Sequence, residues 1–165
     1  MKLVKTWAVV AAGMVLCMAF ASQTIAQGEV LVIVANQGGY KLAENWIEFL
    51  KNESVPYKLI NPAEFETHKK EKFIAILGGP NELEGVGEIV KQLLTEEEQN
   101  WVGKPGNSRM YLKENVWREG QKVLIFAGSD KEMAARARTG NRSKWIGYLN
   151  DWFNIDISTA GLSAY

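Results

Sequence analysis

The chain has 165 residues, of which 47% are hydrophobic and 23% are charged, a composition that suits one globular domain with a well-formed core. Its 19 basic and 19 acidic residues balance, so the net charge gives no reason to expect binding to nucleic acid or to an anionic membrane. The only cysteine is Cys17, which excludes disulfides, a thiol nucleophile and cysteine-based zinc sites from the rest of the chain.

The N-terminal segment has the layout of a secretory signal peptide. Lys2 and Lys5 form a short basic region, and residues 7–21 are almost purely apolar and lead into small residues. We therefore predict that residues 1–26 are a signal peptide and that residues 27–165 form one exported domain, secreted or at the cell surface. The alternative is a retained membrane anchor, although the apolar run is shorter than the roughly 20 residues of a comfortable span.

The first half of this domain alternates strands with helices. Residues 30–35 are apolar throughout and predict a buried strand, which leaves through the loop at residues 36–40. Apolar residues at helical spacing predict a helix over residues 42–51, and residues 56–60 predict a short strand that begins with proline. The charged stretch at residues 63–72 then has room for one helical turn.

The central element is the run Phe-Ile-Ala-Ile-Leu at residues 73–77, closed by Gly-Gly-Pro-Asn. Five apolar residues without a polar break predict a strand that is buried on both faces. Residues 82–94 have helical spacing, with Asn81 placed as the N-cap and Glu84 placed to complete a capping box. The capping pattern recurs at Thr95 and predicts a short second helix.

The second half contains one irregular region and one more buried strand. Residues 103–108 include proline and glycine and predict a loop, whereas residues 109–117 alternate polar with apolar side chains. This alternation predicts an edge strand or a lid over one end of the sheet. Residues 123–127 predict the last buried strand, and helices are predicted at residues 131–138 and 143–153, before a mixed tail with room for one more short strand.

Buried strands that alternate with helices predict an α/β fold, a three-layer sandwich whose mostly parallel sheet has helices on both faces. The economical strand order places the first strand between the second and the third, with the last buried strand beside the third. This order is flavodoxin-like or Rossmann-like.

In such a sheet, ligands bind beyond the carboxyl ends of the strands, near the point where the strand order reverses. Three of the predicted strand exits meet at that edge, and each places glycine next to polar side chains. The candidate ligand-binding residues are Asn36, Gln37, Gly38, Gly39, Gly78, Gly79, Asn81, Ser129 and Asp130. The structural alternative is that the glycines only allow tight turns, while Asn81, Ser129 and Asp130 cap helices. Gly-Gly-Pro-Asn itself is not a phosphate-binding signature.

No catalytic constellation stands out. His68 is the only histidine, and it lies in a charged run that predicts an exposed loop, so neither a Ser-His-Asp triad nor a histidine-rich metal site is indicated. We predict no metal and no cofactor, and the pattern favours a non-enzymatic role. An acidic pair of the glycosidase type is neither indicated nor excluded.

Two groups of side chains are candidates for a partner surface. The basic group comprises Arg136, Arg138, Arg142 and Lys144. The aromatic group comprises Trp101, Tyr111 and Trp117. The basic group is explained equally well as a solvated helix face. The aromatic group flanks the irregular region, where we predict that its members are exposed and able to stack on a sugar or a protein partner. In contrast, Trp46 and Trp145 are predicted to be in the core.

Two segments resemble modules of exported archaeal cell-surface proteins of the S-layer type. One is Ile-Leu-Gly-Gly-Pro-Asn with its amphipathic helix, and the other is Val-Leu-Ile-Phe-Ala-Gly-Ser-Asp with an alanine-rich helix. The likeness covers residues 73–137, and this chain departs from the pattern because it has one short domain and no evident wall anchor. The resemblance implies an envelope location and a binding or structural role, and it implies no catalytic residues.

The sequence therefore supports three functional hypotheses. The first is an exported α/β module that binds an envelope protein or polysaccharide, or has a structural role. The second is a small-ligand-binding or hydrolytic domain that uses the crevice at the strand ends. The third is an assembly subunit, held by its N-terminal segment or by its aromatic edge.

Overall fold

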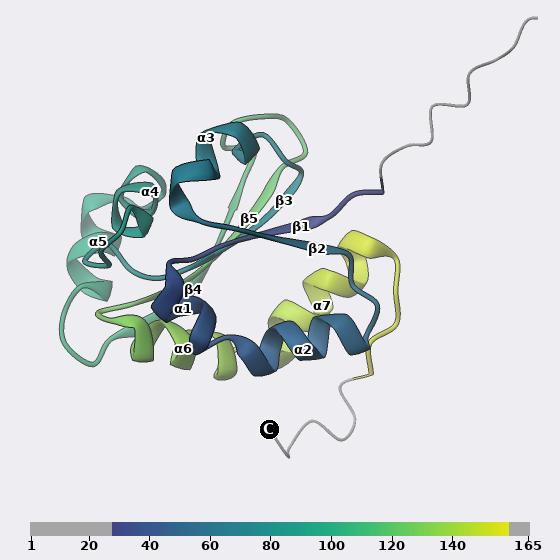
Figure 1. The fold of residues 1–165 in the computed structure, drawn as a ribbon. Helices are drawn as coiled ribbons and strands as arrows, with labels where there is room; N and C mark the ends of the chain where they lie inside the picture. Colours follow the sequence, from purple (N-terminus) through teal and green to yellow (C-terminus); the bar gives the residue numbers. More distant parts are fainter. Residues whose placement is uncertain (1–27, 159–165) are drawn as a thin grey trace, which may run out of the picture.

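The structure is a computed structural model that describes residues 28–158, and its centre is a five-stranded sheet (Figure 1). The spatial order of the strands is β2-β1-β3-β5-β4, in which β4 is antiparallel to β5 and the other neighbours are parallel. The strands are β1 (Leu31–Val34), β2 (Tyr57–Ile60), β3 (Phe73–Leu77), β4 (Ser108–Glu114) and β5 (Lys122–Gly128). This confirms the predicted order of the parallel strands and the assignment of β4 to an edge.

Helices cover both faces of the sheet (Figure 1). The side chains of β1, β3 and β5 alternate between two cores. One core lies under α2 (Glu44–Asn52), α6 (Lys131–Thr139) and α7 (Arg142–Phe153). The other lies under α3 (Phe65–His68), α4 (Val86–Leu93) and α5 (Glu96–Val102). The short helix α1 (Gln37–Lys41) and the 3₁₀ turn η1 (Pro62–Glu64) follow the exits of β1 and β2.

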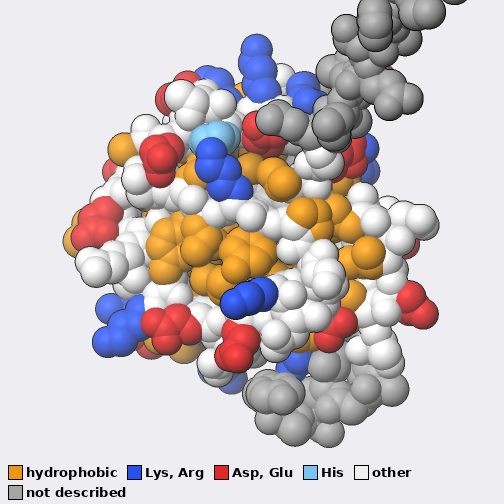
Figure 2. Space-filling model, turned by 45° about the vertical axis from the view of Figure 1, so that its right-hand side comes forward, with side chains coloured by type: hydrophobic (Ala, Val, Ile, Leu, Met, Phe, Trp, Pro, Cys, Tyr) orange, Lys and Arg blue, Asp and Glu red, His pale blue; other side chains and the backbone are white. Residues whose placement is uncertain are grey.

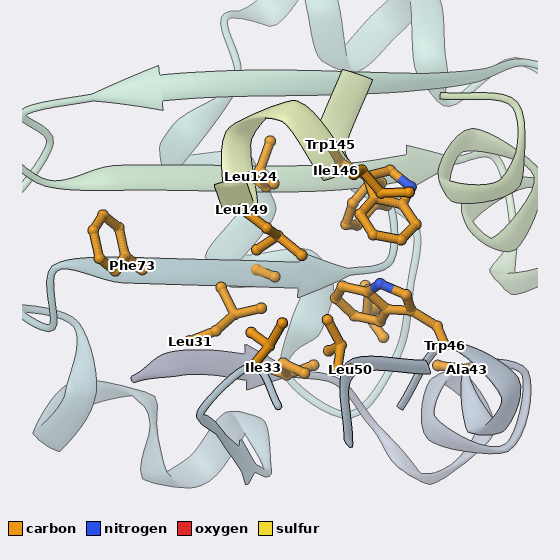
Figure 3. Close-up of a cluster of buried hydrophobic side chains, with 14 of the residues drawn as sticks. Leu31, Ile33, Ala43, Trp46, Leu50, Phe73, Leu124, Trp145, Ile146 and Leu149 are labelled. Carbon is orange, nitrogen blue, oxygen red and sulfur yellow. The ribbon is translucent and has the colours of Figure 1, made fainter. Parts of the chain in front are cut away.

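Aromatic rings pack among aliphatic side chains in the first of these cores (Figure 3). The Trp46 ring meets the rings of Phe126 and Trp145 edge-on, at centroid distances of 5.6 and 5.9 Å. Trp152 stacks in parallel on Phe73 at 5.0 Å. Trp46 and Trp145 are buried, as predicted. Because α2 and α7 bring these rings together from distant parts of the chain, this core joins an early helix and the last described helix to the sheet.

The antiparallel edge of the sheet is fastened to α5. Lys113 on β4 donates to both carboxylate oxygens of Glu98, at 2.7 and 2.8 Å. Thr95 and Glu98 form the predicted capping box at the start of α5. Partial burial tends to raise the pKa of Glu98, but the Lys113 and Thr95 hydrogen bonds outweigh it and lower that pKa overall. This charge pair therefore holds a helix of the second layer against the edge strand.

A predicted helix start and a predicted loop are wrong. Asn81 does not cap α4, which begins only at Val86, because Glu84 and Gly85 have φ angles of +59° and +89° and turn the chain before the helix. The exit of β1 is not a loop, since residues 37–41 form α1.

Other sequence-based expectations concern segments at the two ends. The predicted signal peptide lies outside the described residues, as does most of the tail, and residues 155–158 contain no strand. Within residues 28–158, no helix is long and apolar enough to span a bilayer.

Candidate functional site

The structure brings the three predicted strand exits to one edge of the sheet. Val34 of β1 is in register with Ile76 of β3, and Leu77 of β3 is in register with Phe126 of β5. The Gly78 N–H donates to the Phe126 carbonyl at 3.1 Å. We call the exits after β1, β3 and β5 the strand-end rim. The sequence correctly predicted that these exits lie together.

At the β1 exit, the Asn36 side chain connects α1 with the segment that follows β3. Its Oδ1 accepts from the Gly39 N–H at 2.8 Å and caps α1, while its Nδ2 donates to the Glu82 carboxylate at 3.0 Å. The side chain is almost fully buried, whereas Gln37 is exposed and Gly38 is half-buried. Asn36 therefore spans the gap between the β1 and β3 exits, where the strand order reverses and a ligand would enter.

At the β3 exit, Gly78 and Gly79 are required by close packing. A Cβ on Gly79 would lie 1.7 Å from the Gly128 carbonyl oxygen at the end of β5. Gly78 has a φ of +148°, and a Cβ there would lie 2.6 Å from Val86. Asn81 is exposed and donates to the Gly103 carbonyl at 3.1 Å. The β3 and β5 exits thus touch backbone to backbone and leave no space for a ligand between them.

At the β5 exit, Asp130 rather than Ser129 caps α6. The Asp130 carboxylate accepts from the Met133 N–H at 2.8 Å. Ser129 donates to Asp130 and accepts from the Gly106 N–H at 3.2 Å, so it holds the irregular loop against the rim. Because a carboxylate already occupies the N-terminus of α6, this helix end is a poor place for a bound anion.

The space that remains at the rim is small. One cavity of about 10 Å³ lies between α1 and α6, with room for about one water molecule. Its lining residues are Gly39, Leu42, Leu77, Lys131, Ala134, Ala135 and Arg138. The rim residues are therefore assembled as predicted, but their own contacts fill the crevice that the second hypothesis needs.

The predicted basic group does not form one solvated face. Arg136 and Lys144 are exposed, but Arg138 is only 6% exposed. The Arg138 Nη2 donates to the Leu42 carbonyl at 2.7 Å. Arg142 is half-buried, with its guanidinium 5.2 Å from the centroid of the Phe49 ring. Arg138 faces inward because it follows Ala134 by one helical turn on the buried side of α6.

The three members of the aromatic group differ in how far they are exposed. Trp101 is 37% exposed, with the Arg109 guanidinium 4.0 Å from its ring centroid. Tyr111 is only 8% exposed, so its predicted exposure is wrong: it alternates inward on β4 and packs in the core under α5. Trp117 is half-buried against Phe65, with ring centroids 5.2 Å apart.

A shallow hollow of about 520 Å³ lies beside Trp101. Its other lining residues are Glu96, Glu97, Asn100 and Lys104. All of them lie on α5 or directly after it.

The sequence predicted that His68 is an exposed loop residue, and this prediction is wrong. His68 ends α3, and its side chain is only 18% exposed. Its Nε2 lies 2.9 Å from the Lys58 ammonium, and its Nδ1 lies 3.7 Å from the Glu71 carboxylate. Among the residues that the structure describes, no three potential metal ligands of the His, Cys, Asp or Glu type lie together.

Sequence reasoning missed an apolar surface at the open edge of the sheet. Leu59 on β2 is 41% exposed, and Tyr57 lies on the same side of the strand. Tyr40 and Ile47, from α1 and α2, are partly buried on this side of the sheet. Figure 2 shows apolar side chains gathered below the histidine on this side of the molecule. We call Tyr40, Ile47, Tyr57 and Leu59 the β2 face.

Comparisons of the chain with protein-family models, with curated proteins and with solved structures gave no match.

Proposed function

We propose that the chain is an exported module of the cell envelope or surface, with a flavodoxin-like or Rossmann-like arrangement, that binds a protein partner through the β2 face. The observation that carries this proposal is the exposure of Leu59, a large apolar side chain on an outer strand. Contiguous apolar surface of this kind is typical of protein interaction sites. The strand-end rim is filled by its own contacts and offers no crevice for a small ligand. This supports binding of a partner at the surface.

The backbone of β2 adds to the argument. β2 pairs with β1 on one side only, and the Leu31 N–H donates to the Pro56 carbonyl. In a parallel ladder, alternate residues direct their backbone groups toward the neighbouring strand. The N–H and C=O groups of Tyr57 and Leu59 therefore point to the open edge. An extended partner segment can add there as a sixth strand, with its apolar side chains against the β2 face.

The test is recovery of the partner from source cells. The tagged protein, mildly cross-linked and extracted from the envelope fraction, is expected to retain one dominant protein. Leu59→Asp should lower that recovery about tenfold or more, because a charge is placed in an apolar contact. The control is Leu83→Asp, since Leu83 is 76% exposed and lies in the turn before α4. Equal recovery with both variants would show that the β2 face is not the binding surface.

Export is tested on the same preparation. We expect the envelope-associated protein to begin after residue 21 or 26, as measured by intact mass. A protein that retains its first residues would favour the anchored alternative instead.

The Trp101 hollow favours a second candidate function, the binding of an envelope polysaccharide. Arg109 holds the exposed indole in place, and Glu97 and Asn100 offer hydrogen-bonding groups beside it. An aromatic ring with polar neighbours suits the apolar face of a sugar ring.

For this second function, Trp101→Ala is expected to weaken retardation of the protein in gels that contain the envelope polysaccharide, by about five- to tenfold. Trp101→Phe should keep most of the effect, because it keeps an aromatic face. Identical mobility of the wild type and Trp101→Ala at every polysaccharide concentration would exclude this role.

A further inference from the structure

Two segments of the described chain have the pattern of an N-glycosylation site, an asparagine followed two residues later by serine. They are Asn52-Glu53-Ser54 and Asn141-Arg142-Ser143. In exported proteins, the asparagine amide of this motif receives an oligosaccharide, which is bulky and needs a place on the surface. A motif this short also arises by chance, so the surroundings of each asparagine decide whether it is a usable acceptor.

The Asn52 amide is exposed and has no role in the fold. Asn52 is the last residue of α2, and all three residues of its motif are exposed. No hydrogen bond between residues 28 and 158 uses the Asn52 amide or the Ser54 hydroxyl. Asn52 lies about 200° around α2 from the buried Leu50. The amide therefore points away from the core, where an attached bulky group does not disturb the packing.

Ser54 occupies a backbone position that favours glycine. The N–H groups of residues 54 and 55 donate to the carbonyls of residues 51 and 50, at 3.1 and 2.9 Å. This is the pattern of a helix that is ended by a left-handed residue, and Ser54 has a φ of +56°. Serine costs stability here in comparison with glycine, and its hydroxyl makes no hydrogen bond within the described residues to offset that cost. The hydroxyl therefore indicates a role outside the fold.

The Asn141 amide, in contrast, is already used by the fold. Its Nδ2 donates to the Ala137 carbonyl at 2.7 Å, and the residue is half-buried in the turn between α6 and α7. The next residue, Arg142, is also half-buried, with its guanidinium 5.2 Å from the centroid of the Phe49 ring. A sugar on the Asn141 nitrogen would crowd the last turn of α6, so the folded protein has no suitable place for it.

We propose that Asn52 carries an N-linked oligosaccharide and that Asn141 does not. This inference rests on the proposed export, because the donor, an oligosaccharide joined through oxygen to a lipid phosphate, is met only by chains that reach the exporting membrane. The Asn52 Nδ2 attacks C1 of the first sugar. The N–C1 bond forms, the C1–O bond breaks with its electron pair on the lipid phosphate, and the amide loses one proton to a base of the transferase that catalyses the step.

The modified residue lies beside the β2 face and not on it. Ile47 of that face is about 140° away from Asn52 around α2. The turn at residues 53–56 separates Asn52 from β2. The glycan and the proposed protein partner therefore belong to different sides of this helix.

The test is mass spectrometry of the full chain, purified from the envelope fraction of source cells. In the wild type, the peptide that contains Asn52 should carry the added mass of an oligosaccharide and lose single sugars on fragmentation, and the peptide that contains Asn141 should be unmodified. Asn52→Gln should lose all of the added mass. Asn141→Gln is the matched control and should keep it, as should Leu59→Asp.

Ser54→Gly makes the test independent of misfolding. It removes the hydroxyl of the motif but places glycine at a φ of +56°, so it should lose the glycan while its Tm stays at or above that of Asn52→Gln. A Ser54→Gly protein that keeps the added mass would overturn the inference.

An unmodified Asn52 in the wild type, or an added mass that persists in Asn52→Gln, would also overturn it. The same spectra show whether export fails at the same time. A chain that begins after residue 21 or 26 with Asn52 unmodified means that export stands and the glycan does not. A chain that begins at Met1 and is recovered only from the cytoplasm overturns both.

Discussion

Replacing Gly79 with alanine is expected to lower the free energy of unfolding by about 3 kcal/mol or more. The new Cβ would lie 1.7 Å from the Gly128 carbonyl oxygen, and this obstacle is backbone rather than a flexible side chain. The chain cannot simply shift away, because the adjacent Gly78 N–H is bonded to the Phe126 carbonyl. Urea unfolding of the purified protein measures the effect as a lower midpoint with an unchanged m-value.

The control for this substitution is Gly147→Ala. Gly147 lies inside α7, and a Cβ there would meet no atom within 4 Å. Alanine should therefore stabilise the protein by about 0.5–1 kcal/mol, through helix propensity alone. If Gly79→Ala instead cost less than about 1 kcal/mol, the β3 and β5 exits would not be in contact. The rim would then be open, and the small-ligand hypothesis would regain its crevice.

The buried strands could be predicted from sequence because both of their faces are covered. Residues 73–77 and 123–127 are continuous apolar runs, and in the structure every residue of these two segments is buried. Residues 109–114 do form an edge strand, but both of its faces are partly covered, because Tyr111 packs in one core whereas Met110 and Leu112 pack against the other. Strand order followed from the connections, since short right-handed crossovers leave few arrangements.

The errors at the site arise from contacts between segments that are distant in sequence. The capping pattern at Thr95 forms a helix cap. The similar pattern at Asn81 does not, because the Asn81 amide donates to the Gly103 carbonyl instead. Ser129 and Asp130 were both candidates to cap this helix, but Ser129 bonds to the loop at Gly106 and only Asp130 caps α6. A local pattern cannot show which of two available partners a polar side chain meets.

Burial of Arg138 and exposure of Leu59 were missed for a related reason. Charge suggests a solvated position for an arginine, and only the packing of α6 against α1 reveals that a carbonyl at Leu42 accepts its hydrogen bond. Leu59 pairs with Ile33 of β1, which is fully buried. Leu59 itself lies on the outermost strand at this end of the sheet, where no further strand covers it. Both features therefore depend on tertiary contacts, which a single sequence does not contain.

The other large effect is expected in the aromatic core (Figure 3), where Trp145→Ala should cost about 3–5 kcal/mol. Trp145 is buried against the rings of Trp46 and Phe49, and its indole N–H donates to the Arg138 carbonyl at 2.9 Å. Alanine would remove the ring contacts and the hydrogen bond together. Chemical denaturation is again the measurement, and Trp145→Phe should show an intermediate loss.

The matched control is Trp46→Phe, because the two indoles differ in one respect. Both are buried, but the Trp46 N–H has no hydrogen-bond partner within the described residues. Trp46→Phe therefore loses only volume and removes an unsatisfied donor, so it should cost less than Trp145→Phe by about 1 kcal/mol. The opposite order would mean that the Trp145 hydrogen bond contributes little. Since residues 27–165 contain no cysteine, no disulfide within them supports this core, and the loss of its packing should lower the stability of the protein directly.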